Sequence, residues 1–232
     1  MKLAVMQPYF LPYLPYFQLI NAVDCFIFLD NVNFINKGWI NRNNILVNNE
    51  AHLINLPLVK ASQNRLINSI NIVDEEKWKS KLLKKVELSY KKAPLFEHVM
   101  PLFYKSLIND CKLISDLNQL SIELISDYLE IETKFKRSSD FTFEDQYNGQ
   151  YKILELCSKN KAQLYINPIG GIELYDASVF NKREISLKFL NSGNTIYRQF
   201  KERFVNHLSI LDVLMFNEKE QIKRFLDNYT LL

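Results

Sequence analysis

The residues best suited to chemistry lie close to the start of the chain, in the stretch Gln7–Tyr16. Its amide side chain can both donate and accept hydrogen bonds, its tyrosines offer flat faces and hydroxyls, and its prolines fix the backbone. We therefore predict a ligand-binding loop, with substrate contacts from Gln7, Tyr9, Tyr13 and Tyr16. The alternative is a structural turn whose rings simply pack together.

A carboxylate and an arginine segment follow this loop. Asp30 ends an apolar run, and there it could bind a hydroxyl, an amine or a metal, act as a general base, or only cap a turn. In Trp39-Ile40-Asn41-Arg42-Asn43, Arg42 could clamp a phosphate or carboxylate, while Trp39, Asn41 and Asn43 orient the ligand. We predict Asp30 and Arg42 as catalytic residues. The alternative for the arginine segment is a hairpin with a core tryptophan and a solvated arginine.

Two of the five glycines stand together at Gly170-Gly171, after the apolar run that contains Tyr165. Paired glycines let a backbone approach a ligand, and their amides can bind an anion. We predict substrate contacts from Gly170, Gly171 and the flanking Tyr165 and Tyr175. An ordinary turn would have the same pattern.

Ser209 and Asp212 have the spacing of a helix-capping box, and His207 lies just before them. The sequence leaves open whether these three residues cap a helix or form a Ser–His pair. The histidines and cysteines lack the spacing of zinc ligands, so no metal site is predicted. The phosphate-binding patterns G-x-x-x-x-G-K-[ST] and G-x-G-x-x-G do not occur.

Apolar runs and helical stretches alternate along the chain. This order predicts an α/β fold, Rossmann-like, with a mostly parallel sheet buried on both faces. The predicted strands are 2–6, 25–30, 133–137, 163–167 and 185–190, and the predicted helices between or after them are 17–23, 151–160, 209–216 and 219–229. Ligands of such sheets bind beyond the carboxyl ends of the strands, where residues 7–16 and Asp30 are expected.

Two further features interrupt this alternation. Asn48-Asn49 predicts a tight turn between two hairpin strands, since asparagine tolerates positive φ, and 66–73 alternates like another strand. The block 74–130 has only helical spacing, with helices expected at 77–90, 95–109 and 117–129. Asp74, Pro94 and Ser115 or Asp116 are the predicted start signals of these helices. We thus predict a helical subdomain at 74–130 and an α/β core with a hairpin at 1–73 and 131–232.

The bulk composition limits the classes of function. The net charge is +3, and the basic stretch 81–92 has the spacing of a solvated helix face, so nucleic-acid binding is not predicted. Three scattered cysteines favour free thiols in a reducing compartment. No signal peptide and no membrane-spanning run is visible, and a cytoplasmic location is expected.

With these residues in view, the chain resembles the WbqC-like family over nearly its whole length. The segments that carry the resemblance are 6–13, 16–20, 39–43, Gly170 with Leu174-Tyr175, and 208–212. Family members are typically encoded in bacterial gene clusters for O-antigen and other surface polysaccharides, so the resemblance implies a role in that biosynthesis. The family usually has glycine where this chain has Pro15.

A second, fainter likeness concerns nucleotidyltransferases and pantothenate synthetases. Tyr13-Leu14-Pro15-Tyr16 occupies the place of their His-x-Gly-His motif, before a short helix and a strand. Tyrosine carries no positive charge at neutral pH, so their catalytic histidines have no equivalent here. The likeness supports a Rossmann-like fold rather than the reaction.

Taken with these residues, the family resemblance implies an enzyme that modifies a nucleotide-linked sugar, by transfer of an acyl or aminoacyl group to a sugar amine. ATP or an acyl donor would be its cosubstrate. An ATP-dependent adenylate-forming or nucleotidyl-transfer enzyme is the first alternative. A non-catalytic binding or scaffold protein of the same pathway is the second.

Overall fold

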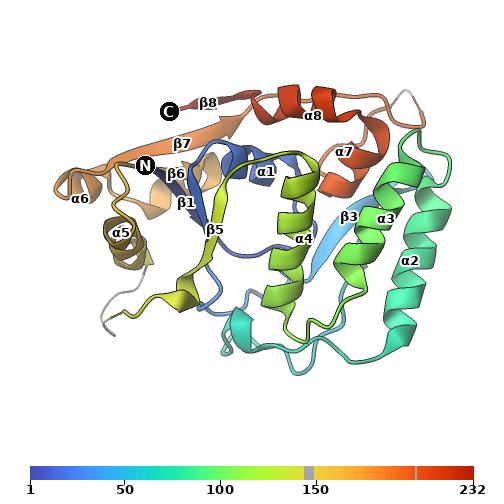
Figure 1. Cartoon of the computed structure of the whole chain (residues 1–232), viewed down its shortest axis with the longest axis horizontal. Helices are drawn as coiled ribbons and strands as arrows, with labels where there is room; N and C mark the ends of the chain where they lie inside the picture. Colours follow the sequence, from blue (N-terminus) through green and yellow to red (C-terminus); the bar gives the residue numbers. More distant parts are fainter. Residues whose placement is uncertain (144–148, 202) are drawn as a thin grey trace.

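A six-stranded sheet forms the centre of the computed structural model, which describes residues 1–143, 149–201 and 203–232. The strand order is β5-β2-β1-β6-β7-β8, and every neighbouring pair is parallel except β7 with β8. Figure 1 shows this sheet with helices around it. The strands are β1 (Lys2–Met6), β2 (Cys25–Phe28), β5 (Lys134–Arg137), β6 (Leu164–Pro168), β7 (Ser186–Ser192) and β8 (Tyr229–Leu231).

Side chains of the sheet alternate between two hydrophobic cores. Leu3 and Val5 of β1 pack in one core with residues of α5 (Gly149–Lys159) and α6 (Ala177–Asn181). Ala4 packs in the other core, with residues of α1 (Leu14–Asn21) and α8 (Lys219–Leu226). Both faces of the sheet are therefore covered, which confirms the predicted mixed α/β fold with a mostly parallel sheet.

The direction in which the chain crosses the sheet reverses at β1. From β1 the chain moves outward on one side, to β2 and then β5. It returns to pair β6 with the other side of β1, and it continues outward to β7. In an open parallel sheet, this reversal leaves a crevice at the carboxyl ends of the two central strands.

The predicted hairpin is confirmed as a separate two-stranded sheet. Strands β3 (Arg42–Val47) and β4 (Glu50–Asn55) are antiparallel. Asn48 and Asn49 form the turn with φ of 52° and 66°, the left-handed region that asparagine tolerates. The hydroxyl of Tyr90 accepts a hydrogen bond from the backbone N–H of Leu46 at 2.8 Å, so the hairpin is tied to the end of helix α2 (Glu76–Tyr90).

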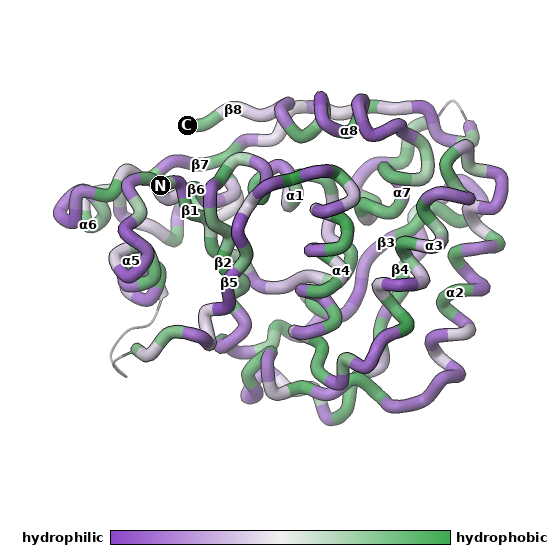
Figure 2. Tube along the Cα trace, viewed as in Figure 1, coloured by the Kyte–Doolittle hydropathy of each residue, from purple (hydrophilic) through white to green (hydrophobic). Residues whose placement is uncertain are grey.

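Three helices fill the block between β4 and β5. They are α2 (Glu76–Tyr90), α3 (Phe96–Leu107) and α4 (Ile114–Tyr128), side by side in Figure 1. Hydrophilic residues recur along α2 in Figure 2, and Lys81, Lys84 and Lys85 are exposed, as expected for a solvated face. Val86 and Ile122 belong to the same hydrophobic core as α1. The division into a core and a helical subdomain stays a prediction.

Two predicted elements are corrected by the structure. Residues 66–73 do not form a strand: they contain the 3-10 turn η1 (Ile67–Ser69) and only isolated bridges. Their backbone groups pair with separate loops, for example Ile67 N–H with the carbonyl of Val32 at 2.9 Å. The last helix ends at Leu226, and Tyr229–Leu231 adds the unpredicted strand β8, because the edge of β7 offers free backbone groups to it.

Helix starts also differ from prediction. Helix α1 begins three residues earlier than expected, with Pro15 in its first turn. The backbone N–H groups of a first turn have no acceptor within the helix, so proline, which has no N–H, is tolerated there. Asp74 and Pro94 were expected to start helices, but each lies one residue before the observed N-cap residue, which is Glu75 for α2 and Leu95 for α3. Helix α4 starts before Ser115 and Asp116, which therefore do not cap it. The Asp116 carboxylate instead accepts a 2.7 Å hydrogen bond from Arg137.

Candidate functional site

A cavity of about 690 Å³ opens at the ends of β1 and β6. Val5 and Met6 of β1, with Gln7 after it, form one part of the wall, and Asn167 and Pro168 of β6 form another. These two strands are adjacent, and the strand order reverses between them. The cavity thus lies in the crevice where open α/β sheets bind their ligands.

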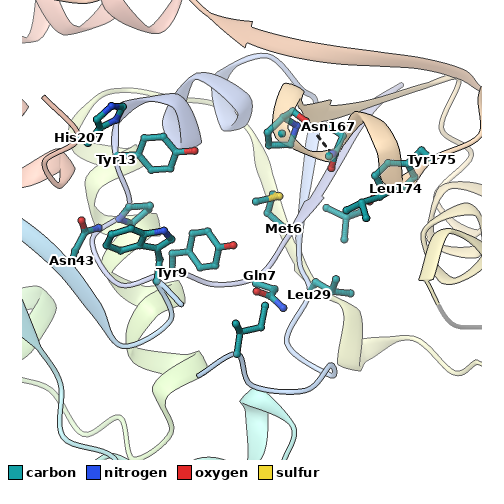
Figure 3. A pocket seen from close by; sticks show the side chains of 17 residues that line it. Met6, Gln7, Tyr9, Tyr13, Leu29, Asn43, Asn167, Leu174, Tyr175 and His207 are labelled. Carbon is teal, nitrogen blue, oxygen red and sulfur yellow. Dashed lines mark hydrogen bonds between the residues drawn. The ribbon is translucent and has the colours of Figure 1, made fainter. Parts of the chain in front are cut away.

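Apolar and aromatic side chains make up most of the wall, together with a few polar groups. Figure 3 shows Tyr9, Tyr13, Asn43 and His207 on one side of the cavity, facing Tyr175 and its neighbours on the other. The lining residues are Val5, Met6, Gln7, Tyr9, Pro12, Tyr13, Leu29, Ile35, Trp39, Asn43, Asn167, Pro168, Gly170, Gly171, Leu174, Tyr175 and His207. Eight of the residues predicted to bind substrate are among them: Gln7, Tyr9, Tyr13, Trp39, Asn43, Gly170, Gly171 and Tyr175.

The loop after β1 is held in place by buried amides that bind its carbonyl groups. Asn43 Nδ2 donates to the carbonyls of Phe10 and Leu11 at 3.0 and 2.7 Å. Asn118 Nδ2, which comes from α4, donates to the carbonyls of Pro8 and Ile40 at 2.9 and 2.7 Å. The loop backbone is therefore fixed before any ligand arrives, which lowers the entropic cost of binding.

The tyrosines of this loop have two different positions: two line the cavity and one is buried behind it. Tyr9 and Tyr13 line the cavity, and their hydroxyls point toward its centre in Figure 3. Tyr16 does not line the cavity: it is buried, and its hydroxyl donates to the carbonyl of Gln7 at 2.9 Å. Burial raises the pKa of Tyr9 and Tyr13 above the usual value of 10.0, so both hydroxyls keep their proton and can donate hydrogen bonds.

Arg42 lies behind Trp39 rather than in the cavity wall. Its Nε donates to the carbonyl of Gly38 at 2.9 Å, and a second guanidinium nitrogen contacts the carbonyl of Lys37. Its guanidinium carbon lies 5.7 Å from the centre of the Trp39 ring, within cation–π range. Arg42 thus holds the turn that presents Trp39. Asn41 is similarly outside the lining, and its Nδ2 donates to the carbonyl of Leu56 at 3.0 Å.

The far wall is formed where β6 passes into the 3-10 turn η3 (Ile169–Leu174). The hydroxyl of Tyr165, which is fully buried behind the wall, donates to Asn167 Oδ1 at 3.1 Å and lies 3.2 Å from the hydroxyl of Tyr175. A Cβ added at Gly171 would lie 2.1 Å from Asn167 Nδ2, whereas one added at Gly170 would meet nothing within 4 Å. Alanine at Gly171 would therefore require the Asn167 amide to shift, whereas alanine at Gly170 would require no shift.

Asp30 lies outside the cavity lining and is surrounded by hydrogen-bond donors. Its carboxylate accepts from the Ser138 hydroxyl at 2.9 Å, from the Ser139 N–H at 3.0 Å and from the Ser139 hydroxyl at 2.6 Å. The side chain is 2% exposed. These contacts tie the end of β2 to the turn after β5, and the catalytic assignments of Asp30 and Arg42 stay predictions.

His207 is one of the nine cavity residues that the sequence did not single out as ligand contacts, and its imidazole can accept or donate a proton. It has a φ of 56°, a backbone conformation that no residue pattern around it reveals. The next residues are held by two backbone hydrogen bonds, from Ser209 N–H to the Asn44 carbonyl at 2.8 Å and from Ile210 N–H to the Pro12 carbonyl at 2.9 Å. The strand β3 and the N-terminal loop thereby fix the position of the histidine.

Ser209 and Asp212 do not form the capping box that their spacing allows. Ser209 occupies the N-cap position of α7 (Ile210–Phe216), but its hydroxyl makes no capping bond and has no partner among the described residues. The carboxylate of Asp212 is buried and accepts hydrogen bonds from Tyr90, Tyr197 and Gln199 at 2.9, 2.7 and 2.7 Å. Asp212 therefore joins α2, α7 and the segment before α7. Its spacing from Ser209 indicated a helix cap and gave no sign of this buried network.

The cavity wall carries little charge. Of the residues that the structure describes, no lysine, arginine, aspartate or glutamate lines it. The described part of the chain also contains no group of three or more histidine, cysteine, aspartate or glutamate side chains placed to hold a metal ion. The chemistry available in the wall is therefore that of tyrosine hydroxyls, amides, an imidazole and aromatic faces.

Comparison with known proteins places this chain among related sequences. The model of the WbqC-like protein family matches residues 7–224. The chain belongs to the WbqC-like family. All but two of the cavity residues, Val5 and Met6, lie inside the matched range.

One curated relative is similar to this WbqC-like chain over nearly its full length. It is the protein of Mycobacterium tuberculosis named Uncharacterized protein Rv1507c, 27% identical over 219 residues, which cover 92% of each chain. No solved structure matches the chain. Within the described residues, no helix of this WbqC-like protein combines the length and the apolar character that crossing a membrane requires.

Proposed function

We propose that this protein transfers an acyl or aminoacyl group to the amine of a nucleotide-linked sugar in surface-polysaccharide biosynthesis. The observation that carries the proposal is the uncharged, aromatic cavity at the β1–β6 crevice with His207 at its wall. Aromatic walls with a few placed polar groups are typical of small-molecule sites. Membership of the WbqC-like family supports the polysaccharide context.

The proposed reaction needs a proton acceptor and a hydrogen-bond donor. The amine nitrogen attacks the acyl carbon, a C–N bond forms, and the bond between the acyl carbon and its carrier breaks. His207 takes the proton of the amine and returns it to the departing carrier, since histidine is the side chain most often used for general acid–base catalysis. The protonated hydroxyl of Tyr9 or Tyr13 donates to the oxygen that gains negative charge during the attack.

The same wall disfavours the ATP-dependent alternative. Adenylate formation and nucleotidyl transfer require positive charge around the reacting phosphates. The described lining provides no lysine or arginine for this purpose. The presence of a cavity beside Gln7 also favours ligand binding over a purely scaffolding role.

Asp30 and Arg42 receive supporting roles in this proposal. Each binds neighbouring backbone or serine groups and neither lines the cavity. We assign Arg42 to the turn that carries Trp39, and Asp30 to the junction of β2 and β5.

A product assay tests the proposed reaction. The protein is incubated with a uridine-diphosphate-linked amino sugar and either acetyl-coenzyme A or an aminoacyl thioester, with and without ATP, and the sugar is analysed by mass spectrometry. The expected result is a sugar heavier by one acyl or aminoacyl group, formed by the wild type and lost in His207→Ala. Asn206→Ala, at the exposed neighbouring position, is the control and should keep activity. Pyrophosphate release without an acylated sugar would contradict the proposal and favour nucleotidyl transfer.

A further inference from the structure

A second cavity, of about 900 Å³, lies in the segment between β7 and α7. None of its lining residues lines the first cavity. They are Ile196, Tyr197, Arg198, Phe200, Lys201, Arg203 and Phe204. The two cavities are therefore separate places in the molecule with different surroundings, and the second is not used by the proposed transfer reaction.

The second cavity has the positive charge that the first one lacks. Arg198, Lys201 and Arg203 line it, and no hydrogen bond or ion pair joins their side chains to another described residue. Glu202 lies outside the described residues, and the segment 196–204 keeps a formal charge of +2 when it is counted. The chain has only 7 arginines against 22 lysines, and two of those arginines are here. Arginine binds phosphate oxygens in a bidentate way that lysine cannot reproduce.

Aromatic rings stand beside these cations. Phe200 packs edge-on against Phe216, with ring centres 4.8 Å apart, and it leaves 40% of its surface exposed. Tyr197 and Phe204 form a second edge-on pair at 5.0 Å. An exposed ring next to arginines is the arrangement on which nucleobases stack while their phosphates are neutralised.

Buried hydrogen bonds anchor the residues next to these cations and rings. Gln199, which is 4% exposed, accepts from the Val205 N–H at 2.8 Å and donates to the Val205 carbonyl at 3.0 Å. Its Nε2 also donates to Asp212 at 2.7 Å, and the hydroxyl of Tyr197 donates to the same carboxylate at 2.7 Å. Buried hydrogen bonds thus anchor Tyr197, Gln199 and Val205. The side chains of Arg198, Phe200, Lys201 and Arg203 are exposed beside them.

We propose that this second cavity binds a nucleoside phosphate. Phe200 stacks on the base, and Arg198, Lys201 and Arg203 hold the phosphate oxygens by charge-assisted hydrogen bonds. The inference stands on residues that the proposed transfer reaction does not use. It would hold even if the first cavity binds no sugar.

Isothermal titration of the full chain with ADP, adenosine and inorganic phosphate tests this site. ADP is expected to bind saturably and at least about tenfold more tightly than either fragment, because only ADP engages rings and cations together. The variant R198A/R203A should weaken ADP binding at least about tenfold, and Phe200→Ala should weaken ADP without changing phosphate binding. Absence of saturable ADP binding to the wild type would overturn the proposal.

Two controls separate this site from the first cavity and from general charge. Arg183→Ala removes one positive charge just after α6, at the opposite end of the molecule from α7 in Figure 1, and should leave ADP affinity unchanged. Tyr9→Ala alters the first cavity and should also leave it unchanged. Equal loss of ADP affinity in Arg183→Ala and R198A/R203A would contradict a specific site, as would loss in Tyr9→Ala alone.

Discussion

The hydroxyl of Tyr90 donates a 2.9 Å hydrogen bond to the carboxylate of Asp212, although the two residues are 122 positions apart in the chain. Tyr90 ends α2, Asp212 lies in α7, and the same tyrosine oxygen accepts from the Leu46 N–H of β3. One buried carboxylate therefore joins the helical block, the hairpin and the segment that leads to both cavities.

Substitution of Asp212 should destabilise the protein because its three donors would lose their acceptor. Asp212→Ala is expected to lower the free energy of unfolding by about 3 kcal/mol, the scale of several buried donors left unpaired. Chemical denaturation followed by circular dichroism measures this. Asp227→Ala, at an exposed position, is the control. A loss of less than ~0.5 kcal/mol would show that the network contributes little.

The free energy of unfolding should depend on pH through the ionisation of the Asp212 carboxyl group. Burial raises the pKa of Asp212 above its usual 3.8, so the folded state binds this proton more tightly than the unfolded state. Its contribution to stability is therefore fully present below pH 3.8 and is lost as the pH rises through the raised folded-state pKa. The difference in unfolding free energy between wild type and Asp212→Asn, measured from pH 3 upward, should change over that interval and level off above it. A difference independent of pH would contradict the buried titration.

Arg42 should act on the cavity through Trp39. Arg42→Ala removes the bonds to the Gly38 and Lys37 carbonyls and the cation under the indole. We expect Trp39 to become more accessible, with a red-shifted fluorescence and stronger acrylamide quenching, in a Trp78→Phe background that leaves Trp39 as the single tryptophan. Arg65→Ala removes a half-buried arginine that also bonds to backbone carbonyls, and it serves as control. Unchanged quenching in Arg42→Ala would leave Arg42 free for the ligand contact predicted from the sequence.

The two neighbouring glycines provide a matched pair. Gly171→Ala forces Asn167 Nδ2 out of a position only 2.1 Å from the new methyl group, and Asn167 lines the cavity. Gly170→Ala adds the same methyl group into open space. Thermal-shift titration with the nucleotide-linked amino sugar should show about tenfold weaker binding for Gly171→Ala and wild-type binding for Gly170→Ala. Equal behaviour of the two variants would exclude the η3 wall from the site.

Much of the fold could be read from the sequence, because local patterns determine it. The short apolar run at 2–6, the turn at Asn48-Asn49 and the apolar spacing of the helices each correspond to observed elements. Strand β8 could not be read, since it forms only because β7 offers an open edge to a segment with helical spacing. Tertiary pairing decided the structure there.

The residue types of the candidate site could be predicted from the sequence. Which of those residues line the cavity and which lie behind the lining could not. Tyr9, Trp39 and Tyr175 line the cavity, whereas Tyr16, Tyr165 and Arg42 support it from behind. Residue type and spacing do not distinguish a ring in the wall from a ring one layer below. The left-handed backbone at His207 was equally invisible, since histidine is enriched at positive φ but still adopts negative φ at most positions.

The central claim is that the N-terminal loop and the end of β6 form two walls of one ligand cavity. Isothermal titration with a uridine-diphosphate-linked amino sugar tests it most directly, on wild type, Tyr9→Ala, Tyr175→Ala and the double variant. Tyr104→Ala, an exposed tyrosine on α3, is the control, and thermal melts verify folding of each variant. We expect each cavity variant to lose at least about tenfold in affinity and the double variant to lose no more than the sum of their free energies, with Tyr104→Ala unchanged. Wild-type affinity in both Tyr9→Ala and Tyr175→Ala would contradict the claim.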